Sequence, residues 1–315
     1  MQRASLCAAS FFKMYSGRNL MELTDAERRL LALHYMFPVP LNRLKRLYET
    51  DPALEKLYMY KAIELAQILK ISLTKASQLK EKLLRNADTP YEKLYERHAI
   101  TPIPFSNPLY PDQLQLLIDP PAVLYVKGDF ALLAEKFKVA IIGSRKATVY
   151  SKEALQLIVP PLVENKAVIV SGLARGADTM AHEAALEFGG KTIAVLGHGL
   201  FHLYPKENHA LAEKLALNHL LVTEYPPYVS PERWTFPMRN RIISGLSSAV
   251  VVTEAADKSG TMSTVEHALD HGKDIYAVPG SITSLLSAGP NKLLDEGAKP
   301  VWNGFQIVGS LVIDG

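Results

Sequence analysis

Short apolar runs that end in glycine recur through the second half of the chain, with amphipathic spacers of helical length between them. One run covers Val139–Ile142 and stops at Gly143, and the next covers Ala167–Val170 and stops at Ser171 and Gly172. Two such runs across a helical spacer are typical of a βαβ unit whose parallel strands are buried on both faces. This stretch therefore predicts the centre of a parallel sheet.

Further apolar runs predict six more strands, and stretches with helical periodicity separate most of them. The strands are expected at Ala122–Val126, Thr192–Leu196, Leu220–Thr223, Ala249–Thr253, Ile275–Val278 and Phe305–Ile313. Helices are expected at Thr179–Glu187, Ala210–Ala216 and Thr261–His271. This alternation predicts an α/β fold over residues 122–315, with a Rossmann-like, doubly wound and mostly parallel sheet.

The earlier part of the chain has a different pattern, with no glycine between Arg18 and Lys127. Helix-forming residues with apolar positions three and four apart predict a small all-helical domain over residues 21–100, similar to SAM or helix-hairpin-helix modules. Its helices are expected within Glu22–Tyr35, Pro40–Tyr48 and Lys61–Arg85, with helix starts at Asp51-Pro52 and Asp88-Thr89-Pro90. A helix-hairpin-helix uses a glycine-bearing hairpin to reach phosphate, which argues against direct DNA reading by this domain.

Proline marks the connection between the two domains. Six prolines lie between Pro102 and Pro121 and predict an extended linker over residues 101–121. At the other end of the helical domain, residues 1–20 do not form a convincing signal peptide, because their apolar part is short and broken by serine. They are interpreted as a leader without fixed structure.

The amino-acid composition excludes fewer classes of function than the pattern of hydrophobic and polar residues does. With 315 residues, 48% of them hydrophobic, the chain can bury the cores of two domains. A formal charge of +3 is compatible with nucleic acid but does not require it. The single cysteine, Cys7, excludes an intramolecular disulfide framework and fits the reducing cytoplasm. No apolar run approaches the ~18 residues of a membrane span.

The residues best suited to bind phosphate follow the two central strands. Gly143-Ser144-Arg145 comes after the first strand, and Ser171-Gly172 is followed closely by Arg175-Gly176 after the second. Small residues let the backbone approach a ligand, and ligands of open parallel sheets bind at these carboxyl ends. Because Arg145 and Arg175 have equivalent positions after neighbouring strands, we expect them to converge on one crevice. Asp178 is expected to cap the following helix.

The segment Pro231–Leu246 combines cations with aromatic rings. Its side chains of interest are Arg233, Trp234, Phe236, Arg239, Asn240 and Arg241. A single-strand binder needs cations that follow phosphates and rings that stack on bases. Trp234 fits a core position equally well. Part of the Arg-Asn-Arg run is expected to cap the apolar helix that follows and to line the crevice.

These motifs resemble those of the DprA/Smf family of bacterial DNA-processing proteins, over roughly residues 102–302. The motifs are Gly143-Ser144-Arg145, Ser171-Gly172-Leu173-Ala174-Arg175-Gly176-Ala177-Asp178, Thr223-Glu224-Tyr225-Pro226, Phe236–Leu246, Ser259-Gly260-Thr261, Val278-Pro279-Gly280 and Gly289-Pro290-Asn291. The resemblance implies that Arg145 is the main phosphate contact and that Phe236 touches bases. Many family members carry a C-terminal winged-helix domain, for which this chain is expected to have no room.

The resemblance also implies a function and partners. It implies a non-catalytic protein without cofactor or metal that binds single-stranded DNA, protects incoming or recombination-intermediate strands, and promotes RecA loading in natural transformation. Single-strand-binding protein and a second copy in a homodimer are the other expected partners. The full set of expected DNA-binding residues is Gly143, Ser144, Arg145, Ser171, Gly172, Arg175, Gly176, Arg233, Phe236, Arg239, Asn240, Arg241, Ser259, Gly260 and Thr261.

Two other interpretations remain open from the residues. Ser259-Gly260-Thr261 resembles part of the PGGxGTxxE pattern of phosphoribohydrolases, so a sensor or hydrolase for a small phosphorylated nucleotide is the main alternative. That alignment places Thr264 where those enzymes carry their catalytic glutamate, which argues against turnover. The third interpretation is a protein-interaction scaffold. His182, His198 and His209 lack metal-ligand spacing and are expected to be structural.

Overall fold

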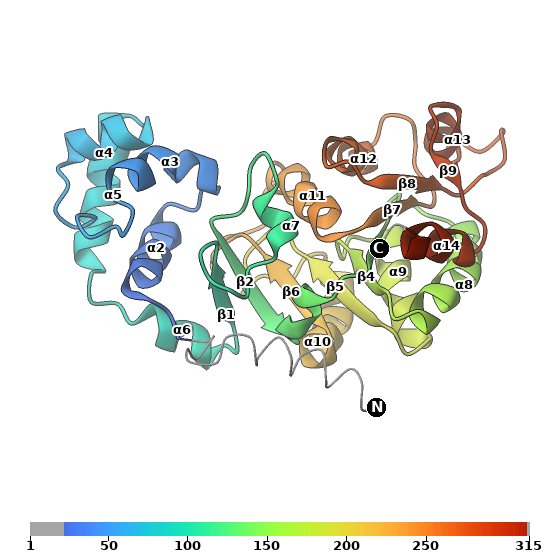
Figure 1. Cartoon of the computed structure of the whole chain (residues 1–315), viewed down its shortest axis with the longest axis horizontal. Helices are drawn as coiled ribbons and strands as arrows, with labels where there is room; N and C mark the ends of the chain where they lie inside the picture. The colour runs from blue at the N-terminus through green and yellow to red at the C-terminus, as the bar shows by residue number, and fades with distance from the viewer. Residues whose placement is uncertain (1–21, 314–315) are drawn as a thin grey trace. The chain divides into compact units, whose positions relative to one another are not determined.

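The computed structural model describes residues 22–313, and contacts divide the chain into two compact units (Figure 1). One unit comprises the chain up to Tyr110 together with Ile118–Leu124, and the other comprises Pro111–Leu117 and the chain from Tyr125 onward. The leader expected over residues 1–20 lies outside the described residues. None of the helices within residues 22–313 has the length and apolarity to cross a membrane.

The first unit is built from helices, as the glycine-free pattern predicts. They are α2 (Asp25–Met36), α3 (Leu41–Thr50), α4 (Ala62–Leu69), α5 (Leu73–Arg85) and α6 (Tyr91–Arg97), followed by strand β1 (Thr101–Pro104). Thr24 caps α2 in a capping box with Glu27. Helix α6 starts directly after Pro90, as expected.

The stretch Lys61–Arg85 is helical as expected, and it forms two helices because Lys70 adopts a left-handed conformation (φ 51°, ψ 49°) that ends α4. The expected helix start at Asp51-Pro52 is wrong. Asp51 does not start a helix. It follows the end of α3, and its carboxylate accepts hydrogen bonds from the backbone N–H groups of Glu55 and Lys56 at 2.9 and 2.8 Å. The aspartate therefore closes a turn and does not cap a helix.

The strands form one sheet in the order β1-β2-β6-β5-β4-β3-β7-β8-β9. The strands after β1 are β2 (Val123–Gly128), β3 (Lys138–Ile142), β4 (Val168–Ser171), β5 (Lys191–Val195), β6 (Leu220–Thr223), β7 (Ala249–Val252), β8 (Asp274–Ala277) and β9 (Lys299–Pro300). Strand β2 runs antiparallel to β6, and the pairs from β6 to β9 are parallel. The α/β, Rossmann-like sheet is confirmed.

Helices cover both faces of this sheet. They are α7 (Asp112–Gln115), α8 (Val149–Glu164), α9 (Ala177–Glu187), α10 (His209–Asn218), α11 (Thr235–Leu246), α12 (Gly260–Asp270) and α13 (Ala288–Asp295), with short 3-10 helices at Phe130–Ala134 and Lys206–Asn208. Helix α8 joins β3 to β4, whereas α11 joins β6 to β7 in the opposite direction along the sheet. Because parallel crossovers are right-handed, the two helices lie on opposite faces. The strand order reverses between β3 and β7, where such sheets bind ligands.

The last expected strand, Phe305–Ile313, is wrong. This segment forms helix α14 (Phe305–Ile313), which begins after Asn303 accepts a hydrogen bond from the Phe305 N–H at 3.0 Å. Ile307 is fully buried in the cluster formed by α8, α9 and the sheet, with Val139 and Ile158 among its members. A short, continuous apolar run has neither helical nor strand periodicity, so the sequence alone does not distinguish the two.

A buried histidine makes the stability of this unit depend on pH. His182 on α9 is fully buried, and its Nδ1 lies 2.7 Å from the Thr192 hydroxyl, which itself donates to the carbonyl of Ile169. The ring therefore donates through Nδ1–H as a neutral imidazole. Burial, together with the charges of nearby His219 and Arg239, lowers the pKa of His182 to about 3.

The free energy of unfolding should fall as the pH drops from about 6.5 towards 3, because in this range the unfolded histidine binds a proton that the folded one excludes. One such group contributes a slope of up to about 1.4 kcal/mol per pH unit. Urea unfolding at several pH values measures it. His182→Asn should flatten the profile, with His209→Asn, at an exposed histidine on α10, as the control. An equally steep profile in His182→Asn would assign the pH dependence to other groups.

Candidate nucleic-acid site

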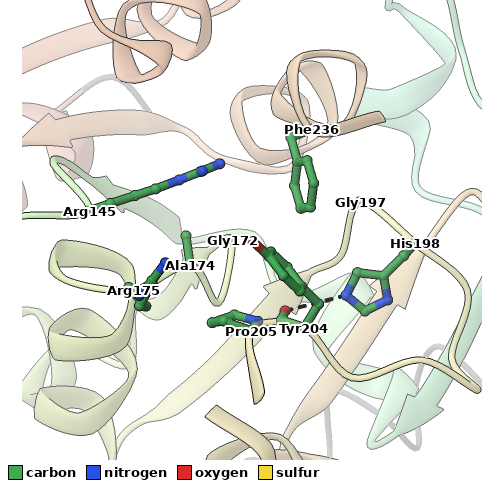
Figure 2. Close-up of a pocket in the computed structure, with 9 residues that line it drawn as sticks. All are labelled: Arg145, Gly172, Ala174, Arg175, Gly197, His198, Tyr204, Pro205 and Phe236. Carbon is green, nitrogen blue, oxygen red and sulfur yellow. Dashed lines mark hydrogen bonds between the residues drawn. The ribbon is translucent and has the colours of Figure 1, made fainter. Parts of the chain in front are cut away.

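The loops after β3, β4 and β5 and the first turn of α11 line one pocket (Figure 2). Its lining residues are Arg145, Gly172, Ala174, Arg175, Gly197, His198, Tyr204, Pro205 and Phe236. Arg145 and Arg175 thus converge on one crevice at the carboxyl ends of the central strands, as their equivalent positions predict. Phe236 joins them from α11.

The enclosed part of the pocket is small. Its volume of about 20 Å³ holds about one water molecule. A nucleotide therefore cannot be enclosed in it, and a larger ligand would have to lie across its mouth.

Arg145 and Phe236 touch each other at this mouth. The guanidinium carbon of Arg145 lies 5.6 Å from the centroid of the Phe236 ring, which is cation–π distance. Arg145 is exposed, and Figure 2 shows its side chain extended towards the ring. The pocket mouth therefore places a positively charged side chain directly beside an aromatic ring.

Arg175 is also available to a ligand. Its guanidinium lies 3.7 Å from the Glu207 carboxylate, and the two side chains are 59% and 62% exposed. Exposed ion pairs of this kind contribute about 0–1 kcal/mol, so a phosphate can replace Glu207 as the partner.

Arg239 does not reach solvent, which corrects its expected role as a phosphate contact. It is buried below the pocket, where its Nη1 donates to the carbonyl oxygen of Gly172 at 2.7 Å and to that of Val195. Burial lowers the pKa of Arg239 to about 10, and the charge of nearby Asp178 opposes this shift. The guanidinium therefore remains charged at neutral pH and ties α11 to the ends of β4 and β5.

Arg241 is likewise committed to a structural partner and not to a ligand. It is buried, and its two terminal nitrogens donate to the two carboxylate oxygens of Glu224 at 2.6 Å each. This fork-to-fork pair fixes α11 to the loop after β6. Neighbouring Asn240 is also buried and donates to Ser263 at 2.7 Å and to the carbonyl of Gly260 at 3.3 Å. The Arg-Asn-Arg run lies inside α11 and does not cap it.

Asp178 organises the loop after β4 from within. Helix α9 begins one residue before it, so Asp178 is not the N-cap that the sequence predicts. Its buried carboxylate accepts hydrogen bonds from the N–H groups of Gly172 at 3.2 Å and Ala174 at 3.4 Å. Burial raises the pKa of Asp178, while Arg239 and these N–H groups oppose the rise. The two N–H groups are therefore not free for a phosphate. Ser171 is not free either, because it is buried and its hydroxyl donates to the carbonyl oxygen of Ile141.

Glu254 organises the loop after β3 in the same way. Its buried carboxylate accepts hydrogen bonds from the Thr148 N–H at 2.7 Å, the Thr148 hydroxyl at 3.0 Å and the Ser151 hydroxyl at 2.8 Å. Its carbonyl oxygen accepts from the Ser144 N–H at 2.6 Å. Thr261 adds a hydrogen bond to the Gly143 carbonyl at 3.0 Å. The loop that carries Arg145 is therefore fastened to the loop after β7.

The remaining expected residues lie around the pocket. Gly176 has φ +75°, and a side chain there would collide with the Ser144 carbonyl, so this glycine lets the two loops approach. Ser259 and Gly260 open α12, and Arg233 is exposed just before α11, but none of the three lines the pocket. Trp234 is 59% exposed, which excludes the core position considered for it.

Sequence reasoning missed the contribution of the loop after β5. Tyr204 and Pro205 line the pocket, and the Tyr204 ring centroid lies 5.7 Å from that of Phe236. His198 is buried beneath them, as its expected structural role requires, with its Nδ1 3.1 Å from the Gly199 carbonyl. An aromatic residue in the loop after a third central strand is the signal that could have identified this side of the pocket.

Metal ligation has no candidate in the described part of the chain. Among residues 22–313, no group of three or more histidine, cysteine, aspartate and glutamate side chains could hold a metal ion.

Comparisons with known proteins agree on one family. The profile of the DNA recombination-mediator protein A family matches residues 101–311. The chain is 42% identical over 237 residues to DNA processing protein DprA of Bacillus subtilis, which covers 73% of this chain and 80% of that protein. It is 46% identical over 200 residues to DprA of Streptococcus pneumoniae, with 63% and 70% covered.

Solved structures show the same likeness. The X-ray structure of DprA from Streptococcus pneumoniae has a TM-score of 0.79 at 34% identity and covers 91% of this chain and 98% of that chain. A structure that concerns the single-stranded DNA binding mode of DNA processing protein A from Helicobacter pylori has a TM-score of 0.60 at 37% identity. It covers 65% of this chain and 93% of that chain.

The close approach of Gly172 to Arg239 predicts a stability defect. A methyl group on Gly172 would stand about 2.5 Å from the guanidinium carbon. Gly172→Ala should therefore lower the free energy of unfolding by about 1–3 kcal/mol, measured by chemical denaturation. Gly309→Ala on α14, where a methyl group meets open space, is the matched control and should be neutral or stabilising. Wild-type stability in Gly172→Ala would contradict the position assigned to Arg239.

Proposed function

Because the chain belongs to the DNA recombination-mediator protein A family, the DprA/Smf family, we propose that it binds single-stranded DNA across the pocket mouth. The observation that carries this proposal is the meeting of Arg145, Arg175 and Phe236 at one site whose enclosed volume is too small for a nucleotide. Two exposed cations beside a half-buried aromatic ring suit a chain of phosphates and bases better than a small enclosed ligand.

The proposed roles follow from the chemistry of each side chain. Arg145 and Arg175 contact consecutive phosphates, and Phe236 stacks on a base that an unpaired strand can present. In the free protein the Arg145 guanidinium covers part of the Phe236 ring. An exposed cation–π contact is worth about 0.5–1 kcal/mol, less than a charge-assisted hydrogen bond to phosphate, so the strand displaces Arg145 from the ring. One movement supplies both a phosphate contact and a free aromatic face.

The wider role that we propose comes from the family resemblance. The bound strand is incoming DNA in natural transformation or an intermediate of recombination, which the protein protects and onto which it promotes loading of RecA, beside single-strand-binding protein. A homodimer would double the number of cations along one strand. The exposed Ile282 and Leu285 in the loop between β8 and α13 are consistent with such a partner surface.

We propose that binding occurs without catalysis. The position that corresponds to the catalytic glutamate of phosphoribohydrolases is Thr264, which is buried in α12. The small enclosed volume also disfavours the alternative of a sensor or hydrolase for a phosphorylated nucleotide. Competition distinguishes the two: a mononucleotide at micromolar concentration should not displace an oligonucleotide, whereas displacement would favour the sensor.

The salt dependence of binding should reflect two arginines and not five. Arg239 and Arg241 are buried and paired, and Arg233 does not line the pocket, which leaves Arg145 and Arg175 as the phosphate contacts. At about −0.7 per phosphate neutralised on a single strand, the slope of log affinity against log salt should be about −1.4 per protomer. Fluorescence anisotropy with labelled oligo(dT) measures it. A slope near zero would contradict the phosphate contacts.

Arg145→Ala should weaken binding and make this slope shallower by about 0.7, because one phosphate contact is lost. Phe236→Ala should weaken binding without changing the slope, because stacking releases no counterions. Lys166→Ala is the matched control, since it removes the same single charge from an exposed lysine that precedes β4, at the end of the strands opposite the pocket. Equal effects of Arg145→Ala and Lys166→Ala would show that overall charge, and not this pocket, holds the strand.

A further inference from the structure

We infer that Tyr204 is a second stacking residue, which holds the base next to the one on Phe236, so that the pocket mouth binds two neighbouring nucleotides. This inference rests on the proposed binding of single-stranded DNA. It comes from the position of Tyr204 in the pocket.

The two rings are arranged to receive separate bases. Tyr204 is 42% exposed, and its ring centroid lies 5.7 Å from that of Phe236 with an angle of 47° between the planes. Rings at this distance and tilt leave no room for a base between them. Each ring instead presents its outer face in a different direction, and each face can accept one base.

The pocket holds two arginines and two aromatic rings, so that each ring has one arginine that could serve the same nucleotide. Figure 2 shows Arg145 and Arg175 on one side of the view and the rings of Phe236 and Tyr204 on the other. Arg145 lies directly over Phe236. Arg175 lines the same pocket from the loop after β4, and its partner Glu207 belongs to the segment that directly follows Tyr204-Pro205. One cation and one ring for each of two nucleotides match the repeat of a strand.

The backbone that carries Tyr204 is fixed before any ligand arrives. The Nε2 atom of buried His198 lies 3.4 Å from the Tyr204 carbonyl oxygen. The same loop is joined to the loop after β6 by hydrogen bonds from the Gly199 N–H to the Val229 carbonyl at 2.8 Å and from the Phe201 N–H to the Pro227 carbonyl at 2.9 Å. An exposed ring on a loop held in this way loses little entropy when a base stacks on it.

The start of α10 is fastened to the other side of the pocket. Asn208 donates from its side chain to the Leu173 carbonyl and to the Thr179 hydroxyl, both at 2.8 Å. These bonds link the segment after Tyr204 to the loop that carries Arg175. The backbone segments that carry Tyr204 and Arg175 are therefore held together by contacts of a buried side chain before any ligand binds.

The test compares strands that differ only in their bases. Anisotropy titrations at matched salt use the full chain with oligo(dT) and with an abasic oligonucleotide of equal length. Tyr204→Ala should weaken binding of oligo(dT) by about 5- to 150-fold and leave binding of the abasic strand nearly unchanged. The salt slope should stay as in the wild type, and Tyr204→Phe should bind like the wild type. Tyr228→Ala, which removes a 41% exposed ring outside the pocket, is the matched control.

A purely structural role for Tyr204 predicts other results. Tyr204→Leu keeps an apolar side chain against Phe236 but removes the aromatic face, so it should lose affinity for oligo(dT) as Tyr204→Ala does. Recovery of binding in Tyr204→Leu would overturn the inference, because covering Phe236 would then suffice. Wild-type binding in Tyr204→Ala, together with a loss in Phe236→Ala, would overturn it while leaving the proposed function intact. Failure of the wild-type protein to bind oligo(dT) would remove both.

Discussion

The pocket depends on one buried cation. The Arg239 guanidinium lies under the carboxyl ends of β4 and β5, where the carbonyls of Gly172 and Val195 accept its hydrogen bonds. Removal of Arg239 would leave these buried carbonyls without a hydrogen-bond donor, at a cost of about 1–3 kcal/mol for each unsatisfied group. Phe236 lies one turn earlier on the same helix, so the contact that secures α11 also sets the position of the ring.

Around this centre, the polar groups divide into an interior set that builds the site and an exterior set that meets the ligand. The carboxylate of Asp178 accepts hydrogen bonds from the loop after β4, and the carboxylate of Glu254 accepts them from the segment after β3. Neither carboxylate is therefore available to a ligand. The side chains left to meet a ligand are the exposed Arg145, Arg175 and Tyr204 and the half-buried Phe236. These interior hydrogen bonds are present before binding, so the loops lose little conformational entropy when DNA binds.

Much of the sheet could be predicted from sequence, because parallel strands buried on both faces appear as continuous apolar runs. The convergence of Arg145 and Arg175 followed from strand order alone. The roles of Arg239 and Arg241 could not be predicted, because the local sequence does not show whether an arginine side chain is exposed to a phosphate or buried against a partner. Their partners lie 67 residues away at Gly172 and 17 residues away at Glu224. Tyr204 was missed because its position beside Phe236 is created only when the loop after β5 folds over the pocket.

The central claim is that bases of a single strand lie on the aromatic side of this pocket. Photo-crosslinking tests it most directly: an oligonucleotide with 5-iodouracil forms a covalent bond to an aromatic side chain on which the base stacks, and mass spectrometry identifies the residue. The crosslinks should fall on Phe236, and on Tyr204 if two bases are held. Crosslinks confined to aromatic residues outside the pocket, for instance to the helical unit or to Trp302, would contradict the claim.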